Sequence, residues 1–211
     1  MNANSCFPIH NSTRRLVSSA ILSVTLAGAL ASANASILSY YANLDGPSES
    51  PANGSPGTGY ATADYDNVAH TLSLNVSWSG LVGATTISHI HAPTTVAFTG
   101  TASIATPTPT FPGFPVGVTS GTYRLTLDLT QTNSYNSPFF TGNGGNTPAG
   151  AETALMAAIA GGKAYWNIHT QSFPGGEIRG FLIPVPEPTS TVLFGVGALA
   201  LGRKAWRRRK I

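Results

Sequence analysis

The chain has 211 residues, of which only 9% are charged, and its formal net charge is +3. Most basic residues lie near the two ends, so residues 36–185 hold three basic residues against seven acidic ones. This mildly acidic stretch excludes the basic surface that nucleic-acid binding requires. The single cysteine, Cys6, lies close to the N-terminus. No disulfide can form within the chain, so a folded domain must be stabilised by its packed core.

Residues 1–35 have the pattern of a secretory signal peptide. Two arginines precede an apolar run at 16–30, and Ala33 and Ala35 place small residues at the positions that signal peptidase reads. We therefore expect an N-terminal signal helix that signal peptidase removes before Ser36. An uncleaved membrane anchor fits less well, because the run is short and a cleavage site follows it.

Residues 36–184 predict one all-β domain. The segment 69–78 is the clearest strand, because Leu72, Leu74 and Val76 alternate with polar residues. The strands expected before the final hairpin are 37–44 (as an edge strand), 59–65, 69–78, 86–92, 95–104 and 123–129. We predict an antiparallel Greek-key β-sandwich of about seven to eight strands with one short helix.

Two long loops and the helix are expected between these strands. Residues 106–118 contain too many prolines for a central strand and predict an extended surface loop. Residues 130–147 predict a second, polar loop. A helix should follow from Pro148 to Ala160, because Thr147 can cap its start and Gly161 can end it.

Residues 161–182 predict a closing hairpin around a Pro-Gly-Gly turn. Pairing His169 with Glu177 separates apolar from polar side chains, and a shift of one residue would mix them. In this register Trp166 lies across from Gly180. The apolar face then carries Trp166, Ile168, Ile178 and Leu182. The polar face carries Asn167, His169, Glu177 and Arg179.

Residues 185–211 combine three features in order: Pro186-Glu187-Pro188, an apolar run at 192–201, and a basic end. This order resembles the PEP-CTERM sorting signal. The run is short, but it can cross a membrane as a transmembrane helix if flanking side chains reach the interface, with the basic end in the cytoplasm. The resemblance implies processing by an exosortase. The protein would first be anchored in the inner membrane of a Gram-negative bacterium and then reach the cell surface or extracellular matrix.

Two sequence blocks resemble the CHRD (chordin) domain, which occurs in animal chordins and in many exported microbial proteins. The later block is AYWNIHT followed, after three residues, by PGGEIRG, and the earlier block is LSLNVSWSGLVGATTISHIHAP. The resemblance covers residues 38–183. The chain departs from the family pattern at Ala92, Trp166 and Phe181, where glycine, a small aliphatic residue and glutamine are common.

His89, His91 and His169 are the candidate metal ligands. A His-x-His pair on a strand presents two imidazoles on one face, and a third histidine could complete a copper or zinc site. Cu/Zn superoxide dismutase is similar in having an alternating strand, a Gly-Leu turn and a His-x-His strand. However, the dense zinc loop and the disulfide are missing, which argues against a full copper–zinc centre.

A structural role for these histidines is the alternative interpretation. Imidazoles on a half-buried face often donate to backbone carbonyls or pair with a carboxylate, here Glu177. Asn167, Glu177 and Arg179 would form a polar cluster on the same face. In the metal-site interpretation, this cluster would orient His169 by hydrogen bonding to the ring nitrogen that does not bind the metal.

Two functions remain open at this point. The first is a non-enzymatic, exported CHRD-domain protein that requires no cofactor and binds extracellular polysaccharide or protein. The second is a copper- or zinc-dependent redox protein on a dismutase-like sandwich. Nucleophile-elbow and phosphate-loop motifs are absent from the sequence, so nucleophilic catalysis is not expected. A carbohydrate-binding module with exposed aromatic residues in its long loops is a third possibility.

Overall fold

One antiparallel sheet of eight strands dominates the structure, a computed structural model that describes residues 37–186. The strands are β1 (Ile37–Asp45), β2 (Thr58–Asp66), β3 (Thr71–Ser79), β4 (Thr85–His91), β5 (Gly121–Asp128), β6 (Tyr165–Thr170), β7 (Ile178–Phe181) and β8 (Ile183–Pro184). Their order is β4-β6-β7-β1-β2-β3-β5, and β8 also pairs with β1. The predicted all-β class is confirmed.

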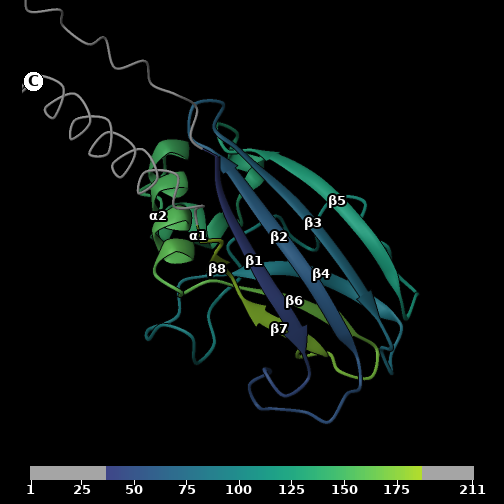
Figure 1. Cartoon of the computed structure of the whole chain (residues 1–211). Helices are drawn as coiled ribbons and strands as arrows, with labels where there is room; N and C mark the ends of the chain where they lie inside the picture. Colours follow the sequence, from purple (N-terminus) through teal and green to yellow (C-terminus); the bar gives the residue numbers. More distant parts are fainter. Residues whose placement is uncertain (1–36, 187–211) are drawn as a thin grey trace, which may run out of the picture. The chain divides into compact units, whose positions relative to one another are not determined.

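The sheet curls into two facing walls (Figure 1). The long strands β1, β2, β3 and β5 form the first wall, while β4, β6 and β7 form the second. The arrangement is sandwich-like, as predicted, with both walls belonging to one hydrogen-bonded sheet. The walls join between β1 and β7, where Asp45 pairs with Arg179. Here a Cβ on Gly180 would collide with the carbonyl group of Asn43, so only glycine lets the β7 backbone lie this close to the β1 backbone.

β1 lies inside the sheet, so the prediction of an edge strand is wrong. All nine of its residues pair with β2, and β7 and β8 pair with its other side. Its alternating Tyr40, Ala42 and Leu44 are buried, as the pattern indicated. Alternation reveals which face of a strand is buried, but it carries no information about how many of its edges find a partner.

The core between the walls follows the predicted alternation. Leu72, Leu74, Val76 and Trp78 of β3 are at most 4% exposed. From the second wall, Trp166 is fully buried and lies across from Gly180. Because Ile168 also pairs with Ile178, the predicted register of the closing hairpin is confirmed.

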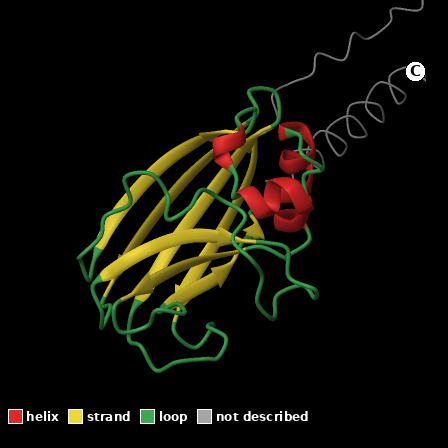
Figure 2. Cartoon of the chain, turned by 180° about the vertical axis from the view of Figure 1, so that it is seen from behind, coloured by secondary structure: helices red, strands yellow, loops and turns green. Residues whose placement is uncertain are grey.

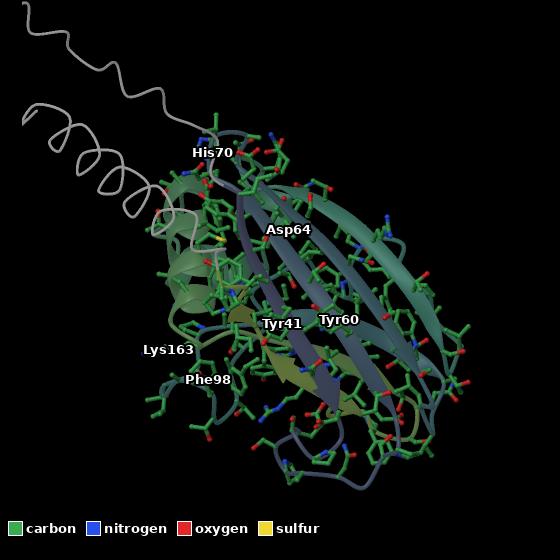
Figure 3. The ribbon with its side chains drawn as sticks, in the orientation of Figure 1. Tyr41, Tyr60, Asp64, His70, Phe98 and Lys163 are labelled. Carbon is green, nitrogen blue, oxygen red and sulfur yellow. The ribbon has the colours of Figure 1, made fainter. Side chains whose placement is uncertain are left out.

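The expected strand at 95–104 is wrong. Phe98 and Gly100 have φ values of 59° and 79°, so the backbone turns there instead of extending. Phe98 donates its amide to the carbonyl of Gly162 at 2.7 Å, and its ring lies against Gly162, next to Lys163 in the chain (Figure 3). This loop therefore folds against the chain that enters β6.

The loop at 106–118 forms without a strand, as predicted, but it does more than cover the surface. It runs along the free edge of β4, where the amide of Phe111 donates to the Ser88 carbonyl at 3.1 Å. The side chains of Phe111 and Phe114 are buried in the core. This proline-rich segment thus closes the core beside the second wall.

The helix predicted before the hairpin is confirmed as α2 (Pro148–Ala160). The hydroxyl of Thr147 accepts a hydrogen bond from the amide of Gly150 at 3.1 Å, and Gly161 follows the last turn. α2 lies with the shorter α1 (Ser137–Gly142) at one end of the sheet (Figure 2).

α1 and the 3-10 turn at Thr132–Ser134 occupy a stretch that was expected to be loop. Within residues 37–186, no helix is long and apolar enough to cross a membrane. The predicted N-terminal signal helix and C-terminal transmembrane helix lie outside the described residues.

Candidate metal centre

Pairing of β4 with β6 brings His89, His91 and His169 together. In this antiparallel pair His89 lies opposite Asn167, and residues two positions apart on either strand share the same face. This face points away from Trp166, which lies in the core between the walls. Loops cover it, so the three histidines are only 0%, 8% and 7% exposed.

The three imidazoles form a tight triangle. Their ring centroids are 5.8, 5.9 and 5.9 Å apart. One ring nitrogen from each histidine lies within 4.8 Å of the other two. In the described part of the chain, no other His, Asp or Glu residues bring three ligand atoms this close together.

Each imidazole is held by one backbone carbonyl. His89 Nε2 lies 2.7 Å from the oxygen of Pro109, and His91 Nδ1 lies 2.9 Å from that of Ala102. His169 Nδ1 makes the same contact with Pro174, at 2.9 Å. Because a carbonyl oxygen can only accept, each of these nitrogens must carry the hydrogen.

The remaining nitrogen of each ring is left with an unshared lone pair. These atoms are His89 Nδ1, His91 Nε2 and His169 Nε2, and all three are buried without a hydrogen-bond partner. A histidine that binds a metal characteristically donates its other N–H to a backbone carbonyl or a carboxylate, which fixes the tautomer and the ring orientation. All three histidines meet this requirement.

Burial also keeps the imidazoles neutral. It lowers the pKa of His89 and of His91 to about 4, against the upward effect of their carbonyl hydrogen bonds. Burial likewise lowers the pKa of His169. At neutral pH the three lone pairs are therefore free of protons and available to a cation.

Arg179 lies between the histidine cluster and Glu49. Its guanidinium lies 4.7 Å from the ring centre of Tyr165, which in turn stacks on His91. Its Nε donates to the Ser48 carbonyl and lies 3.8 Å from a carboxylate oxygen of Glu49. Burial raises the pKa of Glu49 to about 7, although Arg179 lowers it.

Asn167 lies between the histidines and this ion pair, since it pairs with His89 on one side and with Arg179 on the other. Its Oδ1 atom is buried without a partner. Asn167 and Arg179 therefore lie on the histidine face, as predicted. Glu49 was not predicted. The sequence shows Glu49 only as an acidic residue in the long loop after β1, a pattern that does not indicate a contact with Arg179.

Glu177 does not orient His169, and that expectation is wrong. Its carboxylate accepts hydrogen bonds from the hydroxyls of Ser55 and Thr170, each at 2.6 Å, and from the amides of Val82 and Gly83. Thr170 follows His169 and alternates to the other face. Burial alone would raise the pKa of Glu177, but these four donors hold it below its usual value.

A pocket of about 280 Å³ opens beside the histidine face. It lies between residues 49–53 and 172–176, so its lining includes Glu49 and Pro174, the residue whose carbonyl holds His169. The pocket reaches the carbonyl residue that holds His169, while none of the three histidines is among its lining residues.

The predicted processing residues lie at or beyond the limits of the structure. Pro186 is exposed at the end of the described chain. Glu187 and Pro188, like Ala33 and Ala35, lie outside the described residues. Their roles in sorting and signal cleavage remain sequence predictions.

Comparison with known families gives two matches. The CHRD domain model matches residues 40–182, and the PEP-CTERM protein-sorting motif matches residues 184–210. The curated proteins and solved structures that were searched gave no match.

Proposed function

Because the chain belongs to the CHRD-domain family and ends in a PEP-CTERM sorting motif, we propose that it is an exported protein that binds one transition-metal ion through His89, His91 and His169. The sorting motif marks an exported protein that associates with the membrane and is processed by an exosortase. We also propose that the processed protein ends at the cell surface or in the extracellular matrix.

Three buried ring nitrogens without a hydrogen-bond partner, on histidines that bring one nitrogen each within 4.8 Å of the others, carry this proposal. A buried polar atom without a partner costs roughly 1–3 kcal/mol, so three of them side by side are expensive unless something binds them. The carbonyl contacts also suit a structural role, but a structural role gives no partner to the second nitrogen of each ring. Here one nitrogen of each ring is held by a carbonyl, and the other is left free. A metal ion bound by the three free nitrogens would remove this cost.

Binding is favoured over redox catalysis by the enclosure of the site. Each of the three free nitrogens exposes less than 1 Å² to solvent. A catalytic metal needs an open coordination position that substrate or water can reach. We therefore propose a storage, transport or structural role for the ion, in place of the dismutase-like alternative.

A specific observation also favours polysaccharide as the surface partner. Tyr41 and Tyr60 lie on the outer face of the first wall, with ring centroids 6.1 Å apart (Figure 3). Around them, this face carries mainly hydroxyl and amide side chains. Aromatic rings with polar neighbours suit sugar rings, which are apolar on their faces and polar at their edges. Loss of retention on a polysaccharide gel after Tyr41→Ala and Tyr60→Ala, with unchanged stability, would support this contact.

Metal analysis of the untagged protein tests the main proposal. We expect one metal equivalent per chain in the wild type and less than about a tenth of that after His89→Gln together with His91→Gln. His70→Gln is the matched control, because His70 is half exposed and its Nδ1 lies 2.9 Å from the Glu152 carboxylate, away from the three histidines. Folded wild-type protein that takes up no metal would overturn the proposal.

Replacing Pro186-Glu187-Pro188 by alanines tests the sorting step. We expect the precursor to accumulate in membrane fractions, because the exosortase would no longer recognise the tail. Unchanged processing and location would contradict the assigned role of the motif.

A further inference from the structure

We propose that the ion held by His89, His91 and His169 is monovalent copper, Cu⁺, and that Zn²⁺ binds more weakly. This inference rests on the proposed metal site and specifies its ligand. Three properties of the described residues carry it: the charge of the donor set, the number of donors, and the enclosure of the free nitrogens.

The donor set is neutral. The three ligand atoms are imidazole nitrogens, and in residues 37–186 no carboxylate oxygen joins their group. The nearest charged side chains add no net negative charge, because Arg179 is positive and Glu49, 3.8 Å from it, has its pKa raised to about 7 by burial. The cost of burying an ion rises with the square of its charge, so an uncompensated dication costs about four times as much as a monocation. A neutral site therefore favours a singly charged metal ion.

The number of donors also favours Cu⁺ over Zn²⁺. Zinc in proteins is almost always four-coordinate, and a site with three histidines completes its shell with water. The free nitrogens of His89, His91 and His169 are shielded from solvent. The ring of Tyr165 stacks on His91, and the ring of Phe111 lies 6.4 Å from His89. A cuprous ion accepts three nitrogen donors without a fourth ligand, and imidazole is a suitable donor for copper.

The triangle is close to the size that such an ion needs. Metal–nitrogen bonds of about 2.0 Å require nitrogens about 3.5 Å apart in a planar three-coordinate site. One nitrogen of each ring lies within 4.8 Å of the other two, so an approach of at most about 1.3 Å brings such a set to this separation. Rotations about the side-chain bonds would supply this movement.

Competition titrations of the metal-free, full-length protein test the inference. Cu⁺ is supplied anaerobically as its bicinchoninate complex, and Zn²⁺ is titrated against a chromophoric zinc chelator. We expect one Cu⁺ per chain, bound at least about 100-fold more tightly than Zn²⁺. X-ray absorption of the cuprous complex should show three nitrogen neighbours.

Variants separate the ligands from the fold. His169→Gln should weaken Cu⁺ binding by about 100-fold or more, while His70→Gln should not change it. Circular dichroism shows whether each variant is folded, and His91→Gln provides a second test if His169→Gln is not. Tighter binding of Zn²⁺ than of Cu⁺ would overturn this inference and leave the metal site in place. Folded wild-type protein that binds neither ion would overturn both.

Discussion

The imidazole of His91 lies flat against the ring of Tyr165, with centroids 5.0 Å apart and an angle of 2° between the planes. The hydroxyl of Tyr165 also lies within 3.4 Å of the backbone of Ala102, whose carbonyl holds His91 Nδ1. Tyr165 therefore supports the ligand in two ways. It stacks on the ring and steadies the carbonyl that fixes its tautomer.

Removing this support should weaken metal binding without removing a ligand. We expect Tyr165→Leu to lower metal affinity about tenfold, and Tyr165→Phe to lower it less, because phenylalanine keeps the stacking and loses only the hydroxyl. Competition titration measures both effects. Tyr60→Leu, on the exposed outer face, is the control for loss of a tyrosine. Equal effects of the leucine and phenylalanine variants would contradict the role given to stacking.

Glu177 should matter for stability and not for metal binding. Glu177→Ala leaves four donors without their acceptor in a fully buried position, so we expect a loss of roughly 3–5 kcal/mol in the free energy of unfolding. Urea denaturation measures this loss. Asp64→Asn, on the outer face of β2, should change stability by no more than about 0.5 kcal/mol. A change in stability for Glu177→Ala as small as that of the control would contradict the prediction.

Stability of the metal-free protein should fall in mild acid. His89 and His91 have folded pKa values of about 4, below the ordinary 6.5, so the unfolded chain binds protons first as the pH drops from 6.5 to 4. Each histidine then contributes a loss of up to about 1.4 kcal/mol per pH unit. Glu49 acts in the opposite sense between pH 7 and 4.5, because its folded pKa of about 7 lies above its ordinary value.

The loss of stability from the two histidines should exceed the gain from Glu49 as the pH falls. Denaturant midpoints measured from pH 7 to pH 4.5 should therefore decline in the wild type. They should decline less, or rise, in the variant that carries both His89→Gln and His91→Gln. Parallel curves for the two proteins would show that these histidines are not buried in their neutral form.

Gly180 should tolerate no side chain. A Cβ there would meet the Asn43 carbonyl oxygen, which belongs to the backbone and cannot move aside easily. We expect Gly180→Ala to cost more than about 3 kcal/mol of stability, or to prevent folding. Gly175, in the hairpin turn, has open space where a Cβ would lie, with no atom within 4 Å, so Gly175→Ala should be nearly neutral by thermal unfolding. Comparable melting temperatures for the two variants would argue against a close crossing of β1 and β7.

Local sequence patterns were enough to predict several elements. The alternation in β3, the caps of α2 and the pairing of Trp166 with Gly180 all depend on residues close together in the chain. The role of Phe98 could not be found in this way. A short run of apolar and small residues resembles a strand, while its positive φ depends on contacts with the distant Gly162.

The sequence by itself determined the all-β class, the closing hairpin, the sorting motif and the three candidate histidines. Only the tertiary structure decided that these histidines converge, because β4 and β6 are separated by more than 70 residues and meet only when the sheet forms. It also decided which nitrogen of each ring is free, since loop carbonyls at Ala102, Pro109 and Pro174 hold the other one. Side-chain periodicity is a local property of the backbone. The direction of a lone pair depends on groups that folding brings from elsewhere in the chain.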